Sequence, residues 1–288
     1  MTDNGVFFIV FLAQIIFLSI YFPMKIIKRV KRVIKDYPAA QYPKLYAKSV
    51  DYYELGLKIY QFINILILAI GFAVLAFLVV KDREVVEPIE GVFVLFYFML
   101  QMSPFMLMEL SSFSYFKQMR KLNLKKVKTA DLQPRHLFDF ISYQMIVFAV
   151  ISNLLCITVV AYLDGFKIEW GSDTVVLFIT LLLANLLYAL IIRLNISGKK
   201  INPLQSASDR LKQTKTVVNT LVTMSIIQSL FVMLIQVMDY YHLDFYRSTF
   251  ISLFLQLIAW ISLGKTLNTL CIEDIDFEVY KLDDIEKV

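Results

Sequence analysis

Seven long runs of apolar residues are the feature that most constrains how this chain can fold. About 20 consecutive apolar residues cross the hydrocarbon of a bilayer, because a helix rises about 1.5 Å per residue and the hydrocarbon is about 30 Å thick. A bilayer offers no water to backbone amides, so such runs must be helices or barrel strands, and strands would alternate polar and apolar residues. The runs cover about 5–23, 60–80, 91–109, 138–163, 174–193, 216–239 and 248–264. We therefore expect an all-α fold: a polytopic integral membrane helix bundle with seven transmembrane helices over residues 1–264.

The overall composition agrees with this expectation. Hydrophobic residues make up 58% of the chain and charged residues 18%, whereas soluble domains typically have about 45–50% and about 25%. The excess of apolar residues is concentrated in the seven runs, so it indicates membrane helices and not a larger soluble core.

The distribution of Lys and Arg indicates an orientation. Cytoplasmic loops of polytopic membrane proteins carry most of these residues. If the chain starts outside, every one of the 29 Lys and Arg falls on the inner side except Lys81, Arg83, Lys167 and Arg247. We therefore expect the N-terminus outside and the C-terminus in the cytoplasm of a plasma membrane, and the features fit a multi-pass protein of a bacterial inner membrane.

The first run differs from a secretory signal peptide. A signal peptide has positive charge before its apolar region and a small-residue cleavage site after it. Here Asp3 precedes the run and a series of cations follows it. We expect a retained helix.

Residues 24–58 are predicted to form a basic amphipathic cytoplasmic loop. Its first part, 24–35, places Ile and Val on one helical face and six cations elsewhere. One interpretation is a helix that lies along an anionic inner leaflet, where each cation adds about 1 kcal/mol of attraction. The other is a basic anchor that continues the first span. The cations expected to contact anionic lipid are Lys25, Lys28, Arg29, Lys31, Arg32 and Lys35.

Residues 265–288 are predicted to form an acidic cytoplasmic tail. Its acids are Glu273, Asp274, Asp276, Glu278, Asp283, Asp284 and Glu286. Ile275, Phe277 and Val279 alternate with acids, which favours a strand or extended segment over a helix. Either the tail docks on the basic inner loops or a partner protein, or it stays disordered, as charged termini commonly do.

Amides and hydroxyls enter the predicted membrane core. The side chains Gln101, Asn153, Asn185, Gln228 and Gln256 come from five different spans. They form either a polar seam that lines a path for a small polar solute, or interhelical hydrogen bonds, which in lipid contribute about 0.6 kcal/mol each. Pro104 in the third span is predicted to kink that helix.

Ionisable side chains are placed at the ends of the spans. Charges deep in a membrane helix usually mark function because burying them is costly. The sequence places no such residue near the middle of a span, and Glu109 and Arg193 lie at the predicted inner ends of the third and fifth. These two residues are predicted to form an inner-face ion pair.

The motifs of enzymes and metal sites are absent from the sequence. It contains two His, two Cys and no HExxH, GxSxG or phosphate-loop pattern. We expect no catalytic activity, no cofactor, no metal and no nucleic-acid partner. The expected function is that of a scaffold, sensor or accessory subunit that binds a protein partner through its basic cytoplasmic face. The alternative is a transporter or channel for a small polar or amphiphilic solute through the polar seam.

Overall fold

The computed structural model describes residues 4–122, 136–166, 169–198, 202–269 and 271–281. Seven of its helical segments are long and apolar enough to cross a membrane. These segments are Gly5–Asp36, Val50–Glu84, Gly91–Arg120, Tyr143–Leu163, Thr174–Ser197, Ala207–Tyr240 and Asp244–Asn268. The prediction of an all-α, polytopic membrane protein with seven spans is confirmed.

Most helices extend beyond the apolar runs that predicted them. The helices are α1 Gly5–Ile16, α2 Phe22–Asp36, α3 Val50–Glu84, α4 Gly91–Leu122, α5 Tyr143–Leu163, α6 Asp173–Ser197, α7 Ala207–Tyr240, α8 Asp244–Ala259 and α9 Lys265–Thr269. Polar residues before an apolar run are also helical where a capping residue stabilises an earlier helix start. At the start of α7, for example, the Ser206 hydroxyl accepts a hydrogen bond from the backbone N–H of Asp209 at 3.2 Å. The fourth span is the exception. It begins at Tyr143 and not at residue 138, because a short 3₁₀ turn over Leu137–Asp139 precedes it.

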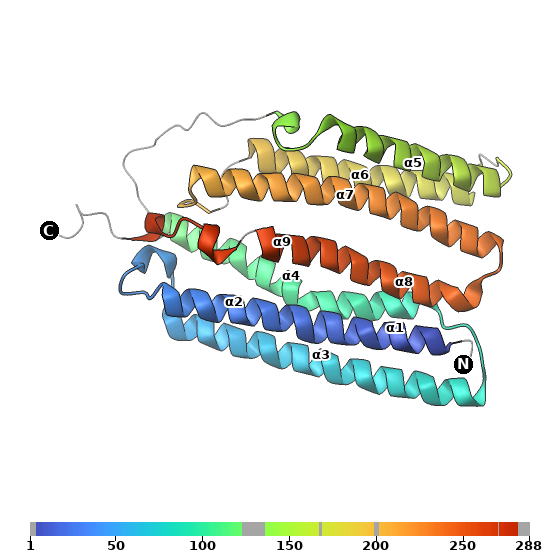
Figure 1. Cartoon of the computed structure of the whole chain (residues 1–288), viewed down its shortest axis with the longest axis horizontal. Coiled ribbons are helices and arrows are strands. Elements are labelled where there is room, and N and C mark those ends of the chain that lie inside the picture. The colour runs from blue at the N-terminus through green and yellow to red at the C-terminus, as the bar shows by residue number, and fades with distance from the viewer. Residues whose placement is uncertain (1–3, 123–135, 167–168, 199–201, 270, 282–288) are drawn as a thin grey trace.

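The first helix runs without a break through the basic segment. A π-helical turn over Phe17–Tyr21 joins α1 to α2, and the three pieces form one rod that ends at Asp36 (Figure 1). Residues 24–36 therefore continue the first span, and they are not a separate helix along the leaflet surface. The predicted loop is shorter than 24–58, since α3 already begins at Val50.

The helices pack in two groups. The four-helix group consists of α1–α2, α3, α4 and α8–α9, and the three-helix group consists of α5, α6 and α7. Figure 1 shows α7 lying alongside α8, where the groups meet. The start of α1 and residues 271–281 lie at opposite ends of the bundle, as an odd number of crossings requires.

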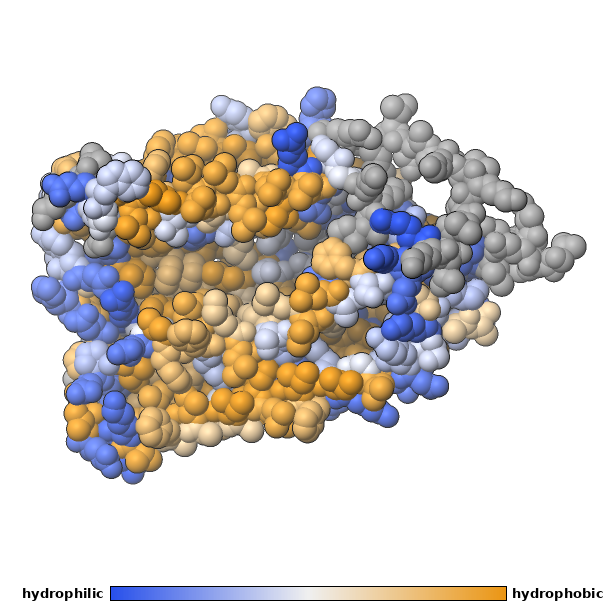
Figure 2. Space-filling view, turned by 180° about the vertical axis from the view of Figure 1, so that it is seen from behind, coloured by the Kyte–Doolittle hydropathy of each residue, from blue (hydrophilic) through white to orange (hydrophobic). Residues whose placement is uncertain are grey.

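Apolar side chains cover the outside of the bundle as well as its interior. Figure 2 shows a broad hydrophobic band between two hydrophilic ends. Large exposed side chains such as Phe77, Phe96 and Leu183 are more than 60% exposed. Such a surface is what lipid requires.

One close helix contact depends on glycine. A Cβ at Gly71 in α3 would lie 1.9 Å from the hydroxyl of Tyr97 in α4. That hydroxyl donates to the Ile67 carbonyl at 3.1 Å, and Tyr97 is 4% exposed. Pro104 lies inside α4, and Figure 1 shows this helix bending partway along, as predicted.

Candidate functional site

Four segments meet at one end of the bundle and form a packed surface layer, which we call the end platform. It consists of residues 37–47, the last turns of α4, residues 202–206 and the tail segment 271–281. Its buried apolar residues are Tyr42, Met119, Leu204, Ile272, Phe277 and Tyr280. In Figure 1 it lies at the end of the bundle opposite the start of α1. The tail segment supplies half of this core, so the platform depends on it.

Phe277 and Tyr280 fix the tail segment to the rest of the platform. The ring of Phe277 stacks on Tyr37, with 3.7 Å between the ring centroids, and is 7% exposed. The Tyr280 hydroxyl accepts a 2.7 Å hydrogen bond from the Asn202 amide. Burial of Tyr280 raises the pKa of its phenol. In addition, the backbone N–H of Asp276 donates to the Asp209 carboxylate at 3.1 Å, which joins the tail to the start of α7.

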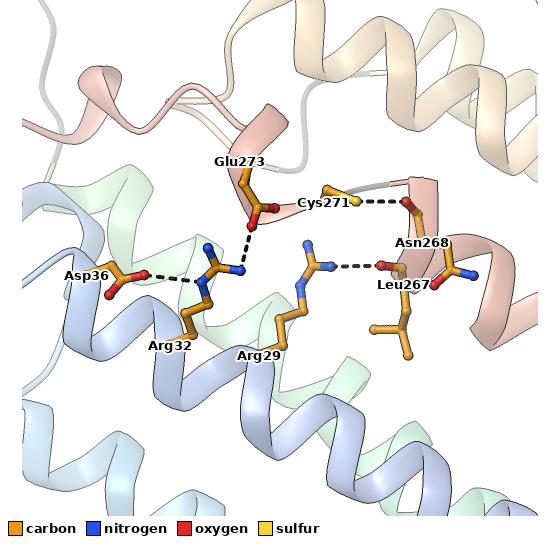
Figure 3. Close-up of polar contacts among 7 residues, drawn as sticks. All are labelled: Arg29, Arg32, Asp36, Leu267, Asn268, Cys271 and Glu273. Atoms are coloured by element: carbon orange, nitrogen blue, oxygen red, sulfur yellow. Dashed lines mark hydrogen bonds and ion pairs between the residues drawn. The ribbon is translucent and has the colours of Figure 1, made fainter.

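Charged contacts join the tail to α2 (Figure 3). The Arg32 guanidinium donates to the Glu273 carboxylate at 2.5 Å and to Asp36 at 3.3 Å. Beside it, Arg29 donates to the Leu267 carbonyl at 3.2 Å. The pKa of Glu273 is lowered, first by a hydrogen bond from its own backbone and then by the hydrogen bond from Arg32.

The six cations predicted to contact anionic lipid divide between two faces of α2. Lys25, Arg29 and Arg32 face the C-terminal segments, where Lys25 donates to the Asn268 side chain at 2.5 Å. Lys28, Lys31 and Lys35 are exposed. Contact with lipid headgroups therefore stays a prediction for these three lysines, while the other three are engaged within the protein.

The described part of the acidic tail is not a strand. Residues 271–281 contain two 3₁₀ turns, Ile272–Asp274 and Glu278–Tyr280. The second turn brings Phe277 and Tyr280, three positions apart, onto the same buried side, which the predicted alternation would not do. The segment packs against the basic loops, as one of the two interpretations expected. Asp283, Asp284 and Glu286 lie outside the described residues.

A first polar cluster lies inside the four-helix group. The Gln14 amide in α1 donates to the Gln101 carbonyl oxygen in α4 at 2.9 Å, and the Gln101 amide donates to Ser19 at 3.0 Å. The Ser252 hydroxyl in α8 donates to Gln14 at 2.6 Å, and Gln256 donates to the Val10 carbonyl at 3.1 Å. Gln14 and Gln101 are 0% and 1% exposed. The hydrogen bonds of this cluster therefore join three helices, and the side chains of Gln14 and Gln101 are shielded from lipid.

A second polar cluster lies in the three-helix group. The Asn153 amide in α5 donates to Ser225 in α7, Ser225 donates to Asn185 in α6, and Asn185 donates back to Asn153, at 3.0, 2.5 and 3.0 Å. This arrangement is a closed ring of three hydrogen bonds, one residue from each helix. Nearby, the Tyr188 hydroxyl donates to Gln228 at 2.7 Å.

The structure thus divides the five residues of the predicted polar seam. Gln101 and Gln256 share the first cluster through Gln14 and Ser252, whereas Asn153, Asn185 and Gln228 take part in the hydrogen bonds of the three-helix group. The five side chains do not line one continuous path. Each makes the kind of interhelical hydrogen bond that holds helices together in lipid.

The predicted ion pair between Glu109 and Arg193 is not formed. Glu109 is exposed on α4 in the four-helix group, and Arg193 is exposed on α6 in the three-helix group. Within the described ranges no ion pair joins them. The prediction failed because it assumed that the third and fifth spans are neighbours, whereas α4 packs on α3 and α8, and α6 packs on α5 and α7.

Gln14 is the site residue that sequence reasoning missed. It is the one amide side chain in the first apolar run, 5–23, and no motif in the sequence pointed to a partner for it. A long polar side chain alone in an apolar run is itself a signal, because lipid leaves its hydrogen-bonding groups unsatisfied. In the described parts of the chain, no group of three or more His, Cys, Asp or Glu could hold a metal ion.

Comparisons with protein-family models, curated protein sequences and solved structures found no match to this chain. The platform and the two polar clusters are therefore the features from which a function can be inferred.

Proposed function

We propose that this protein is a non-enzymatic membrane scaffold or sensor that binds a protein partner through the end platform, on the cytoplasmic side. The supporting observation is the core of the platform. Phe277, Tyr280 and Ile272 of the tail are buried against residues of three other segments. Such a surface has a defined shape, and a defined shape is what specific partner recognition needs.

The charge of the platform supports the same proposal. Glu273 and Asp274 of the tail are exposed, and Lys28, Lys31 and Lys35 are exposed on α2, the helix that Arg32 joins to the tail. Charges of both signs on a rigid surface favour one partner and one orientation more than they add affinity. The polar clusters within the membrane then serve to hold the helices together.

The orientation is tested with the two native cysteines. Cys271 is partly exposed beside the platform, and Cys156 is buried. In a Cys156→Ser protein, a membrane-impermeant thiol reagent should label Cys271 only after the cells are permeabilised. A further variant, Cys271→Ser with Trp170→Cys, places the thiol at a residue that is 91% exposed in the connection between α5 and α6. Figure 1 shows this connection at the end of the bundle opposite the platform, so the thiol should be labelled in intact cells. The reverse pattern would overturn the proposed orientation.

Partner binding is tested by photo-crosslinking in living cells. A photo-reactive amino acid at Lys35 or Asp274 should give a discrete protein adduct, and the same amino acid at Trp170 should not. Phe277→Ala should remove the adduct, because losing a buried Phe typically costs about 3–5 kcal/mol and here releases the tail. Phe148→Ala, the same substitution at a residue of α5 that is 53% exposed and lies outside the platform, should leave it unchanged. An adduct that persists in Phe277→Ala would contradict a role for the platform.

A further inference from the structure

A groove with a volume of about 640 Å³ runs between α5 and α6 in the three-helix group. Its floor comes from α7 and includes Leu221, Val222 and Ser225. Its edges include Val150, Leu154 and Leu182, which are 54%, 59% and 46% exposed. Pockets for small molecules typically measure about 300–1,000 Å³. The apolar, exposed edges mean that this groove opens sideways, toward the hydrocarbon of the bilayer.

The polar groups in the floor of the groove are already engaged. Asn153 donates to the Ala149 carbonyl at 2.8 Å as well as to Ser225, and Asn185 donates to the Leu181 carbonyl at 2.8 Å as well as to Asn153. Both amides thus use both of their N–H groups, and the Ser225 hydroxyl donates to Asn185. A polar solute would find no free donor there. The groove therefore suits a hydrocarbon chain better than a polar solute.

A single cation stands at the platform end of the groove. Arg193 lines the groove, is exposed, and makes no ion pair or hydrogen bond within the described residues. From Leu181 to Arg193 the helix rises about 18 Å, because each residue adds about 1.5 Å. One leaflet of a bilayer has about 15 Å of hydrocarbon, half of the total of about 30 Å. An acyl chain that follows the groove would bring its headgroup to the guanidinium.

We propose that this groove binds one anionic phospholipid from the leaflet on the platform side, with an acyl chain between α5 and α6 and its phosphate at Arg193. Arg is well suited to this role, because its planar guanidinium pairs with two oxygens of a phosphate. The site is independent of the partner-binding role proposed for the platform, since none of its residues belongs to that surface. Through Arg193, α6 would then distinguish anionic from zwitterionic phospholipids.

Native mass spectrometry of the detergent-solubilised full chain tests this proposal. The protein is mixed with equal amounts of phosphatidylglycerol and phosphatidylcholine that carry the same acyl chains. We expect one bound lipid, predominantly the anionic one. Arg193→Gln should lower the preference for the anionic lipid about fivefold, which corresponds to the roughly 1 kcal/mol contributed by one cation near anionic lipid. Lys117→Gln, at an exposed cation of α4 outside the groove, should leave the preference unchanged.

A second pair of variants tests the place of the acyl chain. Ala189 lines the groove and is exposed, so Ala189→Trp should fill the groove and abolish binding of the lipid. Ala76→Trp adds the same bulk to the exposed surface of α3 and should have no effect. Equal binding of both lipids by the unmodified protein, or undiminished binding by Ala189→Trp, would overturn the proposal. So would a dimer that Ala189→Trp dissociates, because a second copy would then occupy the groove.

Discussion

The two helix groups use the same kinds of polar side chain in different surroundings. In the four-helix group, Gln14, Gln101 and Ser252 are at most 1% exposed. In the three-helix group, the ring formed by Asn153, Asn185 and Ser225 lies in the floor of an open groove. The helices differ accordingly. In the most apolar part of the first helix, 39% of the residues are buried inside the protein, whereas in α6 the share is 6%.

This difference shows that an amide in a membrane helix does not by itself indicate a transport path. Both clusters satisfy their donors within the protein, so both hold helices together. The second lies in the floor of an open groove, whereas Gln14 and Gln101 of the first are almost fully buried. We therefore expect the four-helix group to respond to substitution with a loss of stability, and the three-helix group to respond mainly with a change in what it binds.

Within the two helix groups, the largest expected effect is at Gly71. Gly71→Ala should lower the free energy of unfolding by about 1–3 kcal/mol, because its methyl group would displace the buried Tyr97 and break the hydrogen bond to Ile67. Gly56 provides a control in the same helix, since no atom lies within 4 Å of a Cβ there. Gly56→Ala should stabilise the helix by up to about 1 kcal/mol. Chemical unfolding in detergent measures both. If Gly71→Ala is as harmless as Gly56→Ala, α3 and α4 do not pack closely at Tyr97.

The next largest effects come from one substitution in each polar cluster, which can be compared directly. Gln101→Leu should cost about 1.5 kcal/mol, near the upper end for membrane hydrogen bonds, because the Gln14 amide loses its acceptor and the Ser19 hydroxyl loses the donor from Gln101. Asn185→Leu should cost about 0.6 kcal/mol, the average value, because its site adjoins the open groove. The same unfolding assay gives both values. A larger loss for Asn185→Leu would reverse the comparison between the two groups.

The smallest effect concerns pH and the tail. The pKa of Glu273 is lowered in the folded protein, so its contribution is present above the unfolded value of about 4.3 and is lost as the pH falls through the lower folded value. Proteolysis of the tail should therefore accelerate only below about pH 4.3. Glu273→Gln should remove the part of this acceleration that is due to Glu273. An unchanged pH profile in that variant would show that the ion pair with Arg32 does not hold the tail.

The number and type of the spans could be predicted from the sequence, because lipid imposes length and apolarity on each helix separately. The packing of the helices could not. Glu109 and Arg193 illustrate this limit: hydropathy places both at helix ends, but it does not say which helices are neighbours. The contact of Gln14 with Ser252 joins the first and last spans, 238 positions apart, and nothing local in either run indicates it. The docking of the tail was one of two interpretations, since charge alone fits both docking and disorder.

The contact between the first and last spans has a consequence for the order of assembly. The three-helix group is formed by one continuous stretch of chain, residues 143–240, and all its partners are available as soon as that stretch has been synthesised. The four-helix group needs α8, which is made last, to cover Gln14 and Gln101. During biosynthesis these amides remain without their final partner until nearly the whole chain has emerged. The N-terminal helices therefore enter the membrane first and complete their packing last.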